Sequence, residues 1–211
     1  MFRVITVERE YGSGGAEIAR QLSKRLGWKL WDNALTDEIA RVAQVDPSAV
    51  VRCDERCDST FRRLAKVFWR GSYERSMHLE ANQPFDADRM VEIGEKVMHA
   101  AAEAGECVIV GRGAPYFLRT RPDAFHVFLY APRAEKLRRV CATGKSMAEA
   151  EELVDTIDRD RITFVKHYFN ADWPTRSLYH MMINTAIGNE NVLEMILSTK
   201  QMLERKPVLA L

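Results

Sequence analysis

The chain has 211 residues, of which 46% are apolar and 29% are charged, a profile typical of one globular domain rather than of a disordered or fibrous chain. Its 31 basic residues nearly balance its 30 acidic ones, which argues against general binding of nucleic acid or another polyanion. Neither a signal-peptide pattern nor a run of about 18 apolar residues is visible, so we expect a cytoplasmic protein that does not enter a membrane.

Apolar periodicity predicts short strands that alternate with helices. The expected strands cover residues 4–7, 28–31, 107–110, 124–131 and 179–183. The expected helices lie at about 18–26, 34–43, 90–104, 133–142, 147–169 and 192–203. This alternation predicts an α/β fold, in which a parallel sheet of about five strands is covered by helices on both faces. Ligands of such sheets bind at the carboxyl ends of the strands.

Residues 46–87 interrupt the alternation with a stretch rich in basic and acidic side chains. We expect a mostly helical insert here, either with a solvated charged face or as a lobe that covers a substrate. Arginines between residues 52 and 75 could contact nucleic acid, but the acidic residues interleaved with them argue against that partner. The whole chain, 1–211, is therefore expected to be a single domain with one insert.

The four cysteines predict no metal site. Cys53 and Cys57 are the only close pair, and their C-x3-C spacing has no second pair and no nearby histidine, as a zinc site would need. Isolated thiols in a chain of this length fit a reducing compartment.

A glycine-rich loop follows the first expected strand, and helical spacing begins directly after it. The segment reads Glu8-Arg9-Glu10-Tyr11-Gly12-Ser13-Gly14-Gly15. Backbone N–H groups of such a turn can point at a phosphate, and the start of a helix adds partial positive charge. A plain strand-to-helix turn needs only one glycine, so three in four residues favour phosphate binding by Gly12, Ser13, Gly14 and Gly15.

The loop lacks the lysine of the G-x-x-x-x-G-K-[ST] phosphate-binding motif. Gly15 stands where we expect that lysine, which neutralises charge on the β- and γ-phosphates. Arg9, at the end of the strand, is the nearest cation that could replace it. Glu17 could hold magnesium through water, or could simply stabilise the start of the helix.

The same loop resembles the opening segment of cytidylate-kinase-like proteins, which reads R-E-Y/F-G-S-G-G and also lacks the lysine. Four later segments resemble that family in the same order. They are Gly111-Arg112-Gly113, then Asp123 to Pro132 with Arg133, Arg138 and Arg139 beyond it, then Asp158-Arg159-Asp160-Arg161 through Lys166, and finally Ile183-Asn184-Thr185. The resemblance therefore covers nearly the whole chain.

This resemblance implies a three-layer P-loop kinase-like fold and transfer of the ATP γ-phosphoryl group, with Mg²⁺, to a nucleoside monophosphate, with CMP or dCMP as the best guess. It implies that Gly12 to Gly15 hold the donor phosphates, that Arg112 contacts the acceptor, and that Asp32 lies near the acceptor or the metal, with the acceptor as the assignment taken here. It also implies a lid at residues 146–172, whose cations would join Arg112 in catalysis. Those lid cations are Arg159, Arg161 and Lys166.

Three departures leave a second hypothesis open, the first from the classical kinase loop and the other two from the family pattern. The loop lysine is missing, Gly113 replaces the Asp of a G-R-D segment, and Lys166 stands where a second lid arginine is expected. A nucleotide-binding regulatory or interaction protein that kept the fold and lost turnover would have these features. Arg112 and the basic lid favour catalysis instead, because a pure binder needs no mobile cationic lid. The small-molecule nucleotide is the expected partner in both cases, and a homo-oligomer is compatible with the sequence.

Overall fold

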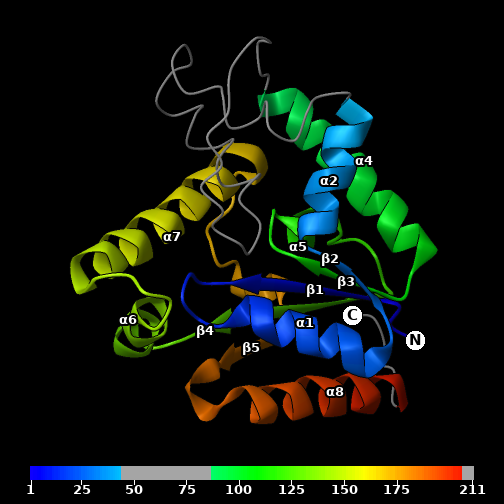
Figure 1. Cartoon of the computed structure of the whole chain (residues 1–211). Helices are drawn as coiled ribbons and strands as arrows, with labels where there is room; N and C mark the ends of the chain where they lie inside the picture. Colours follow the sequence, from blue (N-terminus) through cyan, green and yellow to red (C-terminus); the bar gives the residue numbers. More distant parts are fainter. Residues whose placement is uncertain (44–86, 206–211) are drawn as a thin grey trace.

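The structure is a computed structural model that describes residues 1–43 and 87–205. Within these residues, five parallel strands form one sheet with helices on both of its faces (Figure 1). This arrangement confirms the three-layer α/β fold expected from the sequence. The insert expected at residues 46–87 lies outside the described residues, apart from Ala87, which begins a helix.

The strand order is β2-β3-β1-β4-β5, so the first strand lies at the centre of the sheet. Thr6 on β1 lies beside Ile109 on β3 and His126 on β4. The expected strands are confirmed, with ends that differ by one or two residues. Their bounds are β1 Val4–Arg9, β2 Lys29–Trp31, β3 Cys107–Val110, β4 Ala124–Tyr130 and β5 Met181–Asn184.

Two helices cover one face of the sheet, α1 (Gly15–Leu26) and α8 (Asn189–Arg205), as Figure 1 shows. The other face carries α2 (Asn33–Ala43), α4 (Ala87–Ala104), α5 (Ala114–Phe117) and the carboxyl-terminal part of α7 (Met147–Phe169). Helix α6 (Arg133–Cys141) packs beside α7. The sequence pattern did not predict α5 or the short 3₁₀ turns at Arg176–Leu178 and Thr185–Ile187, because three or four residues carry no helical periodicity.

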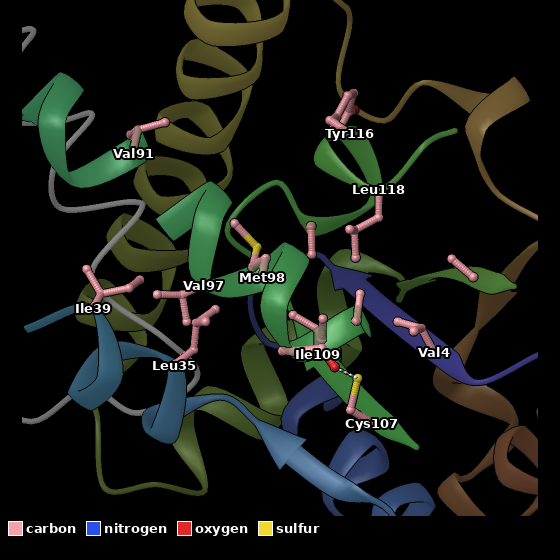
Figure 2. Packing of buried hydrophobic residues seen from close by; sticks show 14 of the residues in the cluster. Val4, Leu35, Ile39, Val91, Val97, Met98, Cys107, Ile109, Tyr116 and Leu118 are labelled. Carbon is pink, nitrogen blue, oxygen red and sulfur yellow. Dashed lines mark hydrogen bonds between the residues drawn. The ribbon is translucent and has the colours of Figure 1, made fainter. Parts of the chain in front are cut away.

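Alternate residues of β1 enter two separate cores. Val4 packs with residues of α2, α4, α5 and α7, and Figure 2 shows part of this cluster around Ile109 and Met98. Ile5 and Val7 pack on the opposite face against α1 and α8. A strand buried on both faces is mostly apolar, which explains Val4, Ile5 and Val7 in the first part of β1.

Local signals set the ends of α1 and α7. Helix α1 ends at Gly27, whose φ of 68° is accessible to glycine without a steric penalty. Helix α7 begins with a capping box, in which the Ser146 side chain accepts from the Glu149 N–H while the Glu149 carboxylate accepts from the Ser146 N–H.

In residues 1–43 and 87–205, none of the helices combines the length and the apolar character that crossing a membrane requires.

Candidate nucleotide site

The glycine loop between β1 and α1 is a tight turn with fixed carbonyl groups. Gly12 and Gly14 have φ angles of 74° and 80°, which side chains rarely tolerate. The buried Ser13 hydroxyl donates to the Glu10 carbonyl at 2.8 Å, so Ser13 stabilises the turn. The Ser13 carbonyl in turn accepts from Thr185 Oγ1 at 2.6 Å and from the Arg139 guanidinium. These bonds join the loop to the end of β5 and to α6.

The first turn of α1 follows the loop and has the electrostatic character that anions favour. Gly14 is the residue before the helix, and it makes no side-chain capping bond. The first N–H groups of a helix have no partner within the helix, and they carry partial positive charge. Glu17 is paired with Arg20 and Gln21 on the helix surface, which lowers the Glu17 pKa. Of its two expected roles, Glu17 therefore fits stabilisation of the helix start better than magnesium binding.

The Arg9 side chain lies beneath this turn, almost completely buried. A Cβ atom at Gly15 would lie 2.7 Å from Arg9 Cβ, and a Cβ atom at Gly111 would lie 1.8 Å from Arg9 Nη1. Arg9 therefore runs from the start of α1 toward the end of β3, through space that the two glycines leave open. Burial lowers the Arg9 pKa to about 10, with the neighbouring Arg161 acting in the same direction, so Arg9 is still a cation at neutral pH.

Arg112, directly after β3, is oriented by the start of α2. Its Nη1 donates to the Asp32 carbonyl at 2.9 Å and lies 3.8 Å from Asp32 Oδ1, and its Nη2 bonds Thr36 Oγ1. Arg112 adopts a φ of 56°, an uncommon value for a residue with a side chain. Burial lowers its pKa to about 10, which leaves it charged at neutral pH. The structure thus brings together Asp32 and Arg112, the two residues expected at the acceptor.

Helix α7 contributes Arg161 and Asp158 to the loop. Arg161 Nη1 donates to the Arg9 carbonyl at 2.8 Å and to Asp158 Oδ1 at 2.9 Å. Asp158 Oδ1 also accepts from the Tyr11 N–H at 2.8 Å. Lys136 on α6 donates to Asp158 Oδ2 and to Glu10 Oε2, both at 3.1 Å. The sequence analysis missed Lys136 and gave Asp158 no separate role, because contacts between two helices leave no local signal.

The other two expected lid cations do not reach this cluster. Arg159 and Lys166 are exposed on α7, and in the part of the chain that the structure describes no bond joins either side chain to the glycine loop. Their spacing explains the difference, since residues two and five positions away from Arg161 lie on other sides of a helix. The role of Arg159 and Lys166 as lid cations stays a prediction.

Gly113, where some family members carry Asp, is enclosed by aromatic rings. A Cβ atom at Gly113 would lie 2.9 Å from a ring carbon of Phe169 and 3.1 Å from one of Phe164. Its φ of 73° also disfavours a side chain. An aspartate does not fit here without displacing these rings.

Among residues 1–43 and 87–205, no group of three or more His, Cys, Asp or Glu side chains is placed to hold a metal ion.

The family described as cytidylate kinase-like matches residues 4–187. The chain belongs to this family. This cytidylate kinase-like chain is 25% identical to the cytidylate kinase of Methanosarcina mazei over 130 residues, which are 59% of this chain and 72% of that relative. Membership confirms the resemblance noted in the sequence and supports a kinase-like enzyme.

Solved structures share the fold of this cytidylate kinase-like chain at low sequence identity. An uncharacterized protein from Eubacterium ventriosum superposes with a TM-score of 0.66 and 19% identity, over 93% of this chain and 96% of that one. Shikimate kinase from Acinetobacter baumannii, solved in complex with shikimate, gives a TM-score of 0.53 and 17% identity, over 95% and 96% of the two chains. These likenesses confirm a P-loop kinase-like fold, and they concern the fold alone.

Proposed function

We propose that this protein transfers the γ-phosphoryl group of ATP to a nucleoside monophosphate, with CMP or dCMP as the expected acceptor. The observation that carries the proposal is the buried Arg9 side chain, whose stem lies against Gly15 at the start of α1 and whose guanidinium lies beside Gly111, so that it can supply the charge that the missing lysine would supply. Phosphoryl transfer needs positioning and charge neutralisation more than covalent chemistry, and these residues can provide both.

The donor phosphates are assigned to the loop. N–H groups of Gly12, Gly14 and Gly15 hold the β- and γ-phosphates, Ser13 keeps the turn in shape, and Arg9 neutralises the charge. Bound Mg²⁺ supplies further charge neutralisation, and we expect it to enter with ATP. Asp32 and Arg112 are assigned to the acceptor, because they lie at the carboxyl ends of β2 and β3, where ligands of parallel sheets bind.

The transferring group is assigned to the space between the loop and α7. Arg161 already contacts the backbone of Arg9, so a small side-chain movement would bring it to a phosphate. Arg159 and Lys166 are proposed to join it when the lid at residues 146–172 closes. Closure would also exclude water, which could otherwise accept the phosphoryl group. CMP as acceptor is supported by the family and by the name of the relative from Methanosarcina mazei.

A second candidate function is nucleotide binding without turnover, as in a regulatory protein. The observation that favours it is that the three buried or half-buried arginines already have carboxylate partners in the chain, from Glu8, Asp32 and Asp158. The closed surroundings of Gly113 favour it as well, since they leave no room for the acidic side chain found in some family members. We expect a cytoplasmic location for either function.

The experiment that separates the two candidates measures ADP formation from Mg-ATP with CMP, dCMP, UMP, AMP, GMP or no acceptor. The proposal predicts acceptor-dependent ADP, highest with CMP or dCMP. Arg112→Ala is expected to weaken acceptor binding by about 1.5–3 kcal/mol, as for a lost charge-assisted hydrogen bond, and Arg112→Lys should recover part of it. ATP binding without ADP formation for any acceptor would favour the regulatory protein.

A further inference from the structure

The spacing of the phosphate-binding motif identifies two exchanged positions in the glycine loop. In G-x-x-x-x-G-K-[ST], a glycine stands five residues before the second glycine, and the lysine stands directly after it. With Gly14 as the second glycine, Arg9 occupies the place of the first glycine, and Gly15 occupies the place of the lysine. The chain therefore has a cation where the motif has glycine, and glycine where the motif has a cation.

The structure places these two positions against each other. A Cβ atom at Gly15 would lie 2.7 Å from Arg9 Cβ and 2.9 Å from Arg9 Cγ. Carbon atoms in favourable contact are about 3.5–4.0 Å apart, so both positions cannot carry a side chain without a shift of the backbone. Gly15 is buried at the first position of α1, and Arg9 is the last residue of β1. Neither element can move freely, because β1 is the central strand of the sheet and α1 packs its buried face against that sheet.

Gly111 is a third residue whose missing side chain leaves room for Arg9. Gly111 has a φ of 64°, and a Cβ atom there would lie 1.8 Å from Arg9 Nη1. The guanidinium thus occupies the space directly beside the end of β3, next to Arg112. Lys136, another buried cation at the loop, is held between the Glu10 and Asp158 carboxylates on the outer side of the turn.

We infer that Arg9 and Gly15 are a reciprocal replacement of the glycine and lysine of the motif, with Gly111 as the positioning residue that admits the guanidinium. Arg9 supplies a positive charge from the end of the strand, whereas the lysine of the motif supplies it from the start of the helix. The two arrangements exclude each other sterically, so a cation fits at either position but not at both. The role of Arg9 toward a triphosphate rests on the proposed function, whereas the steric exclusion does not.

A stability cycle tests the exclusion without any nucleotide. Gly15→Ala adds one Cβ atom and should lower the Tm by on the order of 5 °C in the natural background, as for an overpacked site. In the Arg9→Gly background, Gly15→Ala should leave the Tm unchanged. Arg9→Ala is the matched control, because it keeps the Cβ atom of residue 9, which would lie 2.7 Å from a Cβ atom at Gly15. In this background Gly15→Ala should still lower the Tm. An equal loss of Tm in all three backgrounds would overturn the exclusion.

A binding cycle tests the delivery of charge. Arg9→Gly should weaken ATP binding at least tenfold and AMP binding much less, by loss of a charge-assisted contact to the outer phosphates. Gly15→Lys in that background should restore ATP affinity, or should restore the fold if Arg9→Gly alone is unfolded. Ala16→Lys is the control, since it adds the same charge one residue later, and it should not rescue. Failure of Gly15→Lys to repair either the fold or the affinity would contradict the inference.

The two cycles also separate this inference from the proposed function. If the natural protein binds no ATP, the proposed function and the role of Arg9 toward a triphosphate both fail, whatever the stability cycle gives. If it binds ATP but the rescue fails, the proposed function stands and the reciprocal replacement is wrong.

Discussion

The three arginines at the site each have a nearby carboxylate, and these pairs decide how the charges can act. Glu8 lies 3.7 Å from Arg9, Asp32 lies 3.8 Å from Arg112, and Asp158 lies 2.9 Å from Arg161. A buried cation left without a partner would be strongly destabilising, so the carboxylates keep the arginines charged inside the fold. A bound phosphate has to compete with them, which favours ligands that carry several negative charges, such as a triphosphate.

His126 is the titratable residue from which we expect a clear pH dependence of stability. It is buried on β4, bonded to Thr6 Oγ1 at 2.7 Å and close to His180, and burial lowers its pKa from 6.5 to about 4. The folded state therefore binds fewer protons than the unfolded state between these two pH values. The free energy of unfolding should fall by about 2–3 kcal/mol as the pH drops from about 6.5 to 4.

Urea unfolding of the natural protein and His126→Gln at several pH values measures this contribution. Glutamine stays neutral, so the variant should lose much less stability on acidification. His99→Gln is the control, because it makes the same exchange at a half-exposed side chain on α4. Parallel pH profiles for the natural protein and His126→Gln would mean that His126 is not the titrating group.

At the scale of elements, α7 and α6 hold the glycine loop from outside. Asp158 on α7 accepts from the Tyr11 N–H, from Arg161 and from Lys136, and Lys136 also bonds Glu10. A Cβ atom at Gly12 would lie 3.0 Å from the Lys136 carbonyl oxygen, so the loop packs directly on α6. The position of the glycine loop therefore depends on two helices that follow it by more than a hundred residues.

Asp158→Ala should loosen the loop, because it leaves Lys136, Arg161 and the Tyr11 N–H without their shared acceptor. We expect a loss of about 2–3 kcal/mol of stability and faster amide exchange at Tyr11, measured by urea unfolding and hydrogen exchange. Asp155→Ala is the matched control on the same helix, where Asp155 pairs with Arg133 at the surface, and it should cost less than about 1 kcal/mol. Equal effects of the two substitutions would show that Asp158 does not hold the loop.

At the scale of the whole molecule, the sequence predicted elements better than it predicted the site. Continuous apolar runs such as Cys107–Val110 identified the strands, because a strand covered on both faces has little room for polar residues. The glycine loop was found because it stands between a strand and a helix. Lys136 and Asp158 were missed as partners of the loop, since they lie 22 residues apart and meet only when α6 packs on α7.

Two features of the arginines also needed the structure. The sequence suggested Arg9 as the replacement for the lysine, but only the structure places its stem against Gly15 and its guanidinium against Gly111. Likewise, Arg159 and Arg161 are equivalent in the sequence motif, and the packing of α7 turns only Arg161 toward the loop. Side-chain direction at this level depends on how helices dock, which local periodicity does not specify.

The most direct test of the donor site is a calorimetric titration of the natural protein and Arg9→Gln with Mg-ATP and with AMP. Glutamine keeps much of the side chain and removes the charge. We predict that the natural protein binds Mg-ATP, and that Arg9→Gln loses about tenfold or more of that affinity while AMP binding changes little. Equal affinity of both proteins for Mg-ATP, or no binding by the natural protein, would contradict a triphosphate site at the glycine loop built around Arg9.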